Sequence, residues 1–435
     1  QGVTGMLFDV GDCHTLAAEL RELAGDSELR RRMGDAVYER ARRDFSAAGT
    51  CRKQLEIYEK VIARYAKRRE KLRDGIVICG AYGHGNAGDE AILSSMIRQL
   101  RSMDPDLAVT VISRSPQDTR ESHNVNSIGR GQLRKQRRAF RSAELYINGG
   151  GSLIQDVTSR RSLWFYLNTI KVAKEQGCLV HMYGCGIGPL LYGLDRKMSA
   201  SVLNGSVDVM TLRDPDSLAL LREIGVTGPE LILSADPVLS VPPCGEEQTL
   251  EFMEANGLKA DGSYVCLSLR PWVGFGEKAP CIAAALRRLC TEKGLTPVFL
   301  PMNYAKDEEV SRLVAELTGL EFVMLPEIRD PGLAIGVMSK MKLVAAMRLH
   351  SLLFAANGGT PSVGISYDPK VSGFVEYTGC GACIELGELT EDRLSELLLR
   401  LCGEDKQAEL AENLKKVRAA EGRNLEAARR LMRRI

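Results

Sequence analysis

The chain lacks several features that would assign its function at once. It has no apolar stretch of 18 residues and no signal-peptide pattern, which excludes a membrane-spanning helix and a secretory leader in this sequence. Its net charge of +2 over 435 residues excludes a strongly polycationic nucleic-acid-binding protein. The five histidines show no paired metal-ligand spacing, and the single motif Cys380-Gly381-Ala382-Cys383 has no second cysteine pair. We therefore expect no metal site and no nucleic-acid partner.

The composition is that of a folded protein with substantial cores. Hydrophobic residues make up 44% of the chain and charged residues 26%, and the length suggests two to three domains. The twelve cysteines are scattered, and several lie within apolar runs, which predicts buried free thiols in a reducing compartment. We expect a cytoplasmic protein that can meet the inner face of the membrane. The sequence begins at Gln1 rather than Met, as a piece of a longer protein would.

The order of strand and helix patterns divides the chain into three parts. Residues 1–73 show helical patterns only and cannot form an α/β domain alone. Residues 74–241 alternate strands and helices, residues 242–250 read as a Pro-rich linker, and residues 251–435 repeat the alternation and end in helices. This predicts an α/β protein with a helical N-terminal segment and two Rossmann-like, doubly wound domains in a GT-B-like arrangement around a cleft.

Four short loops follow predicted buried strands and carry the most chemical information. They are residues 83–90, 148–152, 184–188 and 348–351. Loops at the carboxyl ends of parallel strands line one crevice, and glycine there lets backbone N–H groups approach an anion closely. The triple glycine of the second loop is predicted to open a helix that contains Gln155 and Asp156; a tight turn without a ligand is the alternative. The loops predict a small-anion site with acid–base chemistry.

The first loop matches a dinucleotide-binding fingerprint, Gly83-x-Gly85-x-x-Gly88, but the following residues argue against that function. Asp89 and Glu90 fall in the first turn of the next helix, where they would repel a pyrophosphate. Asp89 is instead a candidate general base toward a hydroxyl group. The alternative is that both carboxylates only complement the helix dipole.

The last loop supplies the candidate cation and acid. Arg348 and His350 flank Leu349, and alternation along a continuing strand would point both side chains the same way. Arginine can bind a carboxylate or phosphate with two nitrogens, and histidine can transfer a proton near neutral pH. The alternative for His350 is a packing or helix-capping role.

The remaining candidates for substrate binding lie in the same loops and at other strand ends. They are Asn86, Gly88, Gly149, Gly150, Gly151, Ser152, Gln155, Gly186, Gly188, Arg213, Arg270 and Lys370. Ordinary salt bridges are the alternative for Arg213, which is followed by Asp214, and for Arg270. Two basic tracts are either solvated helix faces or contacts for acidic lipid and lipid-linked diphosphate. They comprise Arg130, Arg134, Lys135, Arg137, Arg138 and Arg141, and at the end of the chain Arg429, Arg430, Arg433 and Arg434.

Taken together, the motifs between residues 75 and 385 resemble the polysaccharide pyruvyl transferase family, in particular its bacterial cell-wall type, which modifies the polymer that anchors S-layer proteins. The matching signatures, in order, are Tyr82-Gly83-x-Gly85-Asn86-x-Gly88-Asp89-Glu90, Gly149-Gly150-Gly151-Ser152-Leu153-x-Gln155-Asp156, Gly184-x-Gly186-Ile187-Gly188-Pro189, Arg213-Asp214, Ala235-Asp236-Pro237 and Met347-Arg348-Leu349-His350-Ser351. Residues 1–73 resemble the C-terminal end of a family-4 GT-B glycosyltransferase, and no activity is assigned to them.

The resemblance implies transfer of pyruvate from phosphoenolpyruvate to a sugar as a ketal. The implied acceptor is N-acetylmannosamine of a lipid-linked saccharide, modified at O4 and O6, and no cofactor is implied besides the donor phosphoenolpyruvate. As a hypothesis, Arg348 with Arg213 or Arg270 holds the anions, His350 is the acid and Asp89 is the base. Two alternatives remain. One is a GT-B glycosyltransferase with a nucleotide-sugar donor, for which Glu376 is the nearest candidate for the ribose contact; the other is a non-catalytic saccharide-binding module.

Overall fold

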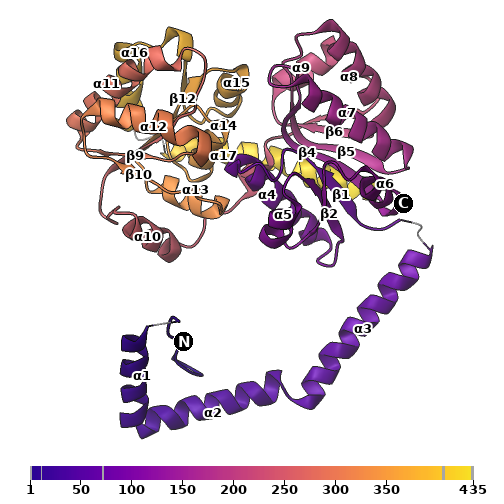
Figure 1. The fold of residues 1–435 in the computed structure, drawn as a ribbon, viewed down its shortest axis with the longest axis vertical. Helices are drawn as coiled ribbons and strands as arrows, with labels where there is room; N and C mark the ends of the chain where they lie inside the picture. The colour runs from indigo at the N-terminus through magenta and orange to yellow at the C-terminus, as the bar shows by residue number, and fades with distance from the viewer. Residues whose placement is uncertain (1, 11, 71–72, 404–406, 433–435) are drawn as a thin grey trace. The chain divides into compact units, whose positions relative to one another are not determined.

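A computed structural model describes residues 2–10, 12–70, 73–403 and 407–432 (Figure 1). Contacts divide the chain into two units, Gln1–Leu72 and Arg73–Ile435. The first unit consists of the helices α1 (Cys13–Gly25), α2 (Ser27–Asp44) and α3 (Ala47–Glu70). Among its described side chains only Leu29 and Met33 are buried hydrophobic ones, so this part of the chain builds no core comparable to that of a domain.

The first half of the second unit is a seven-stranded parallel sheet in the order β3-β2-β1-β4-β5-β6-β7. Its strands are β1 (Ile76–Cys79), β2 (Val109–Ser113), β3 (Asn126–Gly129), β4 (Leu145–Ile154), β5 (Leu179–Ile187), β6 (Val209–Leu212) and β7 (Glu230–Leu233). The connecting helices are α4 (Ala87–Met103), α5 (Pro116–His123), α6 (Leu133–Ser142), α7 (Arg160–Glu175), α8 (Gly193–Ser206) and α9 (Pro215–Glu223). The central strands form because their apolar runs are covered by helices on both faces.

The second half is a six-stranded parallel sheet in the order β10-β9-β8-β11-β12-β13. Its strands are β8 (Tyr264–Ser268), β9 (Thr296–Phe299), β10 (Val323–Met324), β11 (Leu343–Ala346), β12 (Ser362–Ser366) and β13 (Ala382–Glu385). The accompanying helices are α11 (Phe275–Lys293), α12 (Tyr304–Thr318), α13 (Pro331–Ser339), α14 (Leu349–Asn357), α15 (Pro369–Thr378), the short η2 (Leu386–Glu388) and α16 (Glu391–Gly403). In both sheets the strand order reverses beside the first strand, which opens a crevice at the carboxyl ends of the strands.

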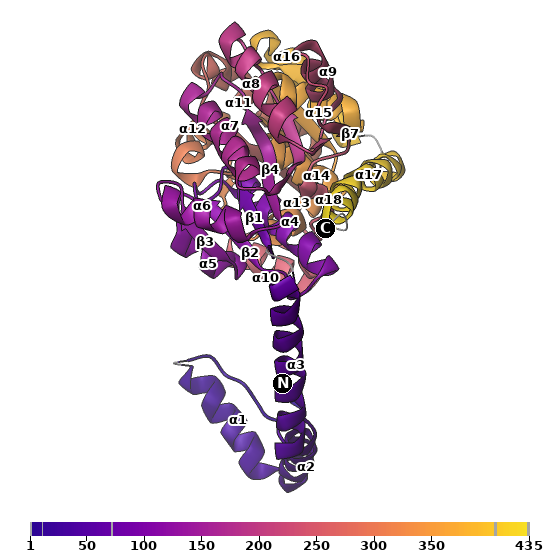
Figure 2. The same cartoon turned by 90° about the vertical axis from the view of Figure 1, so that its right-hand side faces the viewer.

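The connections between the halves differ from the sequence-based expectation. After η1 (Pro237–Ser240), α10 (Glu246–Ala255) already begins inside the expected linker of residues 242–250. At the end of the chain, α17 (Gln407–Glu421) leads to α18 (Arg423–Met432), and these two helices lie together at one flank (Figure 2). Although residues 251–435 were expected to form the second domain, α18 packs on β5, β6 and α4 of the first. Its apolar face is buried there.

The two halves share one hydrophobic core. A continuous cluster of buried side chains runs from Ile76 and Ile92 in the first half to Val344 and Leu352 in the second. Backbone bonds cross the same boundary, with the N–H of Ala87 donating to the carbonyl of Met302 at 3.2 Å. The relative position of the two sheets is therefore fixed by packing rather than by a flexible linker.

Two further expectations can be compared with the structure. All twelve cysteines are free, and Cys79, Cys178, Cys266 and Cys290 are buried, as predicted. In the described part of the chain, no helix has both the length and the hydrophobicity that are needed to cross a bilayer.

The triple glycine does not end a strand, as the sequence predicted, but lies inside β4. Gly150 and Gly151 have φ angles of +59° and +70°, a conformation that favours glycine. A Cβ on Gly150 would overlap the side chain of Ile92, because β4 passes directly under α4. The expected helix over Gln155 and Asp156 is a loop, and α7 starts only at residue 160.

Substitutions in the triple glycine test whether close packing or backbone strain dominates there. Gly151→Ala should lower the free energy of unfolding by about 1–2 kcal/mol through backbone strain alone, since the nearest atom to its Cβ is Asp89 Oδ1 at 3.4 Å. Gly150→Ala adds the overlap with Ile92 and should cost more. Urea unfolding of both variants and of Gly150→Ala/Ile92→Ala measures the difference. Equal losses in the two single variants would contradict the packing argument.

Candidate active site

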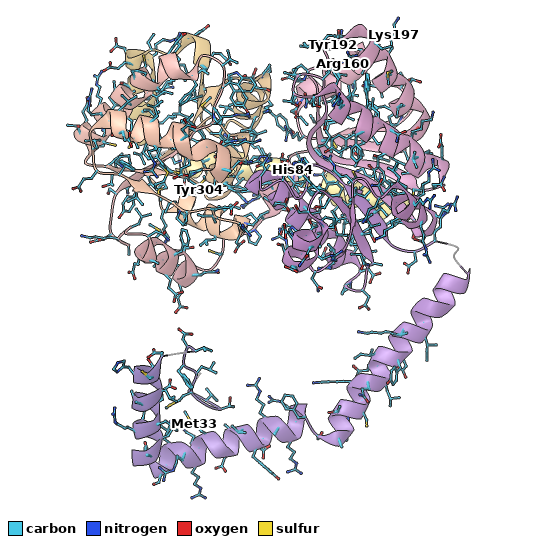
Figure 3. All side chains as sticks on the ribbon, viewed as in Figure 1. Met33, His84, Arg160, Tyr192, Lys197 and Tyr304 are labelled. Carbon is cyan, nitrogen blue, oxygen red and sulfur yellow. The ribbon has the colours of Figure 1, made fainter. Side chains whose placement is uncertain are left out.

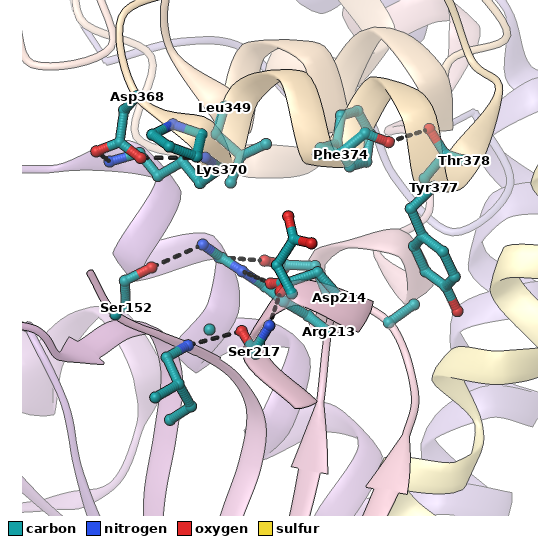
Figure 4. Close-up of a pocket in the computed structure, with 18 of the residues that line it drawn as sticks. Ser152, Arg213, Asp214, Ser217, Leu349, Asp368, Lys370, Phe374, Tyr377 and Thr378 are labelled. Carbon is teal, nitrogen blue, oxygen red and sulfur yellow. Dashed lines mark hydrogen bonds and ion pairs between the residues drawn. The ribbon is translucent and has the colours of Figure 1, made fainter. Parts of the chain in front are cut away.

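A cavity of ≈ 240 Å³ lies where the two halves face each other (Figure 4). From the first half, the ends of β4, β5 and β6 contribute Ser152, Gly186 and Arg213. From the second half, α14 and α15 contribute Leu349 and Lys370. The parallel strands thus bring residues that are far apart in the sequence to one crevice, as their positions predicted.

Arg213 is the central cation of this cavity, and its side chain is only 6% exposed. Its Nη1 donates to Asp236 Oδ2 at 2.9 Å and its Nη2 to Ser152 Oγ at 3.0 Å. Asp214 adds a carboxylate oxygen 3.6 Å from Nε. A Cβ on Gly186 would lie 2.8 Å from Nε, so glycine at this position makes room for the guanidinium. These neighbours consequently hold the Arg213 side chain in place and compensate its charge.

Two further cations flank Tyr367 on the second half, of which Lys370 lines the cavity and Arg270 lies outside its lining. Lys370 Nζ lies 5.3 Å from the centre of the Tyr367 ring and 3.3 Å from Asp368 Oδ2. Arg270 Nη1 donates to Tyr367 Oη at 2.7 Å, and its guanidinium carbon lies 4.7 Å from the centre of the Tyr367 ring and 5.0 Å from that of Trp272. Arg270 Nε is buried without a hydrogen-bond partner among the described residues. In that part of the chain Arg270 also has no carboxylate partner, which distinguishes it from Arg213 and Lys370.

Arg348 is bound on one edge by a carboxylate that the sequence analysis did not expect. Its Nε and Nη2 bond Asp307 Oδ2 and Oδ1 at 3.0 and 2.5 Å, and Asp307 is fully buried on α12. The expected alternation with His350 also fails, because α14 begins at Leu349 and Arg348 is its N-cap residue. These two bonds leave both N–H groups of Nη1 and one N–H group of Nη2 for a substrate.

His350 packs directly on the first half of the molecule. A Cβ on Gly88 would overlap the imidazole, so the close approach requires glycine. The Nε2 atom is buried without a hydrogen-bond partner in the described residues. Burial lowers the pKa of His350 to about 4, and the nearby Arg213 acts in the same direction while Asp236 opposes it. At neutral pH the imidazole is therefore uncharged.

Asp89 lies in the first turn of α4, next to Gly88. Asn86 caps this helix and donates its Nδ2 to Asp89 Oδ2 at 2.5 Å. Burial and the neighbouring Glu90 raise the pKa of Asp89 to about 7, although Arg213 and Arg348 oppose this. The same two arginines influence the pKa of His350, which places all four groups in one electrostatic cluster. In the free site the carboxyl group is therefore partly protonated near neutral pH, and the imidazole is not.

Several predicted binding residues have other surroundings. Gly149 and Gly150 face Met96 and Ile92 of α4, so core packing accounts for them. Gln155 bonds Thr158 within the loop after β4 and does not line the cavity. Gly151 approaches Asp89, and Gly188 does line the cavity.

Sequence reasoning missed other residues that shape the site. Asp236, which bonds Arg213, belongs to the signature Ala235-Asp236-Pro237, but the sequence analysis assigned it no role. Asp307, which holds Arg348, gave no sequence signal because α12 is far along the chain. Glu376, the expected ribose contact of a nucleotide-sugar enzyme, is exposed on α15 and is absent from the cavity lining.

Comparison with known proteins agrees with this geometry. The family model described as polysaccharide pyruvyl transferase matches residues 86–369, more than half of the chain. The chain belongs to the polysaccharide pyruvyl transferase family. It is accordingly a transferase, and the matched span contains Asp89, His350 and the cavity residues of the first half, whereas Lys370 and the later lining residues of α15 lie beyond its end. No curated protein sequence matches the chain.

Solved structures share the fold of this pyruvyl transferase family member. Anabaena Alr3699/HepE in complex with UDP and glucose has a TM-score of 0.55 at 12% identity, over 83% of this chain and 100% of that chain. The S. aureus MnaA–UDP structure has a TM-score of 0.53 at 10% identity, over 78% and 91% of the respective chains. Such low identities establish the two-domain GT-B architecture and nothing of the ligand.

The buried pair of Arg213 and Asp236 gives a prediction about stability. Arg213→Met leaves the Asp236 carboxylate, 4% exposed, without its partner, and should lower the free energy of unfolding by about 3–5 kcal/mol. Arg213→Met/Asp236→Asn should recover much of that loss without restoring activity. Arg430→Met, which removes an exposed pair with Glu230, is the control and should cost about 0–1 kcal/mol. Chemical denaturation checks all three, and equal losses for Arg213→Met and Arg430→Met would contradict the assignment.

Proposed function

We propose that the protein transfers pyruvate from phosphoenolpyruvate to a sugar, forming a 4,6-ketal and releasing phosphate. The proposed acceptor is N-acetylmannosamine in a lipid-linked cell-wall saccharide. The observation that supports the proposal is that Arg213 and Lys370, from the two halves, line one cavity, and that the titratable pair Asp89 and His350, outside its lining, is under the electrostatic influence of the same Arg213. Family membership supplies the reaction class.

The donor brings a carboxylate and a phosphate, so the site must supply free cationic donors. The charge of Arg213 is already compensated by Asp236 and Asp214, and its Nη2 bonds Ser152. The charge of Arg348 is compensated by Asp307. Arg270, in contrast, has a buried Nε without a partner and no carboxylate partner among the described residues. We assign Arg270, with Lys370 across Tyr367, to bind the anionic groups of the donor, and we assign Arg213 to shape the cavity.

The remainder of the cavity suits a saccharide. Asp214 and Asp216 offer carboxylate oxygens that can accept hydrogen bonds from sugar hydroxyls. Phe374 and Tyr377 offer aromatic surface from α15. The first half would thus hold the acceptor between its strand ends and the helix of the second half.

The reaction requires one proton for the methylene carbon and the removal of two from the acceptor. Protonation of that carbon gives C2 oxocarbenium character, one hydroxyl adds to form a phospho-ketal, and the second hydroxyl displaces phosphate. One released proton restores the acid and the other leaves with phosphate. Since Asp89, with a pKa of about 7, carries a proton in part of the molecules near neutral pH and His350 is neutral, we assign Asp89 as the acid and His350 as the base. These roles are the reverse of the sequence-based hypothesis.

A phosphate-release assay tests the reaction and the role of Arg270. Phosphate should appear only when phosphoenolpyruvate and an N-acetylmannosamine-containing acceptor are both present. Arg270→Ala should lower kcat/KM for the donor about 30- to 1,000-fold, because an anion contact in the transition state is worth about 2–4 kcal/mol. Tyr367→Phe removes only the hydroxyl that Arg270 bonds and should have a smaller effect. Turnover of a nucleotide sugar without phosphoenolpyruvate would refute the reaction, and unchanged donor kinetics in Arg270→Ala would refute the assignment.

The protonation of Asp89 predicts the pH dependence. If its acid form is required, kcat/KM should fall as the pH rises through about 7. Glu90 is one cause of the raised pKa of Asp89, so Glu90→Gln should move the falling limb to lower pH. A pH effect from the donor's own ionisation would not move with this substitution. A kcat/KM that rises through the same range would instead make Asp89 the base.

A further inference from the structure

The first half carries an exposed apolar surface beside the cavity. It consists of Val157, Trp164, Leu191, Tyr192 and Leu194, whose exposed fractions lie between 42% and 69%. These residues, here called the aromatic patch, come from the loop after β4, the first turns of α7, the loop after β5 and the start of α8. A concentration of large apolar side chains in solvent marks an interaction surface rather than chance exposure.

The patch is held rigidly by two buried carboxylates. Asp156 accepts the N–H groups of Leu191 and Tyr192 at 2.8 and 2.9 Å, which fixes the loop after β5. Asp195 accepts Arg160 Nε at 2.6 Å and Trp164 Nε1 at 3.0 Å, which ties α7 to α8. The apolar side chains therefore face outward because the structure holds them there.

The charges around the patch are mostly positive where they reach solvent, with Glu223 at the border as an exposed carboxylate. Asp156 and Asp195 are buried, at 4% and 0% exposure. The guanidinium of Arg160 lies over the rings of Tyr192 and Trp164, at 4.6 and 5.3 Å from their centres. Arg161 and Lys197 are exposed, and Figure 3 shows Arg160, Tyr192 and Lys197 at the same end of this half. Arg196 is paired at the border with Glu223.

We propose that the aromatic patch docks the protein on a lipid surface that contains anionic headgroups. Trp and Tyr favour the boundary between water and hydrocarbon, and cations beside them attract anionic lipid. A saccharide is a poorer fit, because the aliphatic side chains of Val157, Leu191 and Leu194 offer its hydroxyl groups no hydrogen bonds.

The aromatic patch lies close to the cavity along the chain. Gly188 and Pro189 line the cavity, and Leu191 of the patch follows two residues later. Docking would hold this edge of the cavity near the membrane surface, where a lipid-linked acceptor is presented. This last step rests on the proposed function, whereas binding to lipid does not.

The basic tract predicted from the sequence is the competing surface. Arg134, Lys135, Arg137, Arg138 and Arg141 are exposed on α6, where Leu133 is the exposed large apolar residue. Arg130 instead stacks on Phe165, Arg430 pairs with Glu230, and Arg433 and Arg434 lie outside the described residues. Binding through α6 would be almost purely electrostatic and lost in high salt, whereas the aromatic patch adds an apolar contribution.

Co-sedimentation with vesicles tests the docking without substrate. The full chain is mixed with vesicles of phosphatidylglycerol and phosphatidylcholine in equal parts, and with phosphatidylcholine alone. The full chain should bind the anionic vesicles, and Leu191→Glu/Leu194→Glu should weaken this binding about tenfold or more, because it replaces inserted apolar groups by like charge. Leu313→Glu/Leu317→Glu on α12, where both leucines are 42–43% exposed, is the matched control and should bind as the parent does.

Tryptophan fluorescence provides an independent readout. The chain has two tryptophans, so Trp272→Phe leaves Trp164 as the only reporter. Its emission should shift to the blue with anionic vesicles and persist in part at high salt. Loss of binding only in a charge-reversed α6 variant, with Leu191→Glu/Leu194→Glu unaffected, would overturn the proposal. A Trp164 shift with soluble saccharide alone, a concentration-dependent dimer that covers Trp164, or no vesicle binding would overturn it as well.

Discussion

The contact between Gly88 and His350 is the constraint on which the site depends. The first turn of α4 can approach the imidazole of the second half only because position 88 has no side chain. The shared hydrophobic core keeps the two sheets close enough for this contact. Asp89 follows Gly88 directly, so the same contact brings the acidic group and the imidazole into one low-dielectric region. The order of their pKa values is then reversed, with Asp89 raised to about 7 and His350 lowered to about 4.

Charge compensation gives the cations of the cleft different capacities. Arg213 and Arg348 each pair with a buried carboxylate, Asp236 and Asp307, so none of these buried charges is left uncompensated. Such arginines are rigid parts of the scaffold. Arg270 is held by contact with two adjacent aromatic rings and by a hydrogen bond to one hydroxyl group, which orient the guanidinium without neutralising it. A guanidinium held in this way is oriented in advance for an anion.

The sequence predicted the larger features well. Alternating strand and helix patterns gave two Rossmann-like halves, and the strand ends carried Ser152, Gly186, Arg213 and Lys370 to one cavity. The motifs also identified the family. The errors arose where local patterns were extended too far: the triple glycine lies within β4, and Arg348 already caps α14. In both places packing against α4 or α12 overrides the local pattern.

The sequence alone determined which elements form and which residue types end their strands, because apolar periodicity and glycine placement are local properties. It could not determine the partners of the charges. Asp307 lies 41 positions from Arg348 and Asp236 lies 23 from Arg213, and only folding brings each pair together. Which arginine remains available to a substrate, and which of Asp89 and His350 holds a proton, depends on those partners and on burial. These properties belong to the tertiary structure because electrostatic energy is set by distance and dielectric in space, and neither follows from position along the chain.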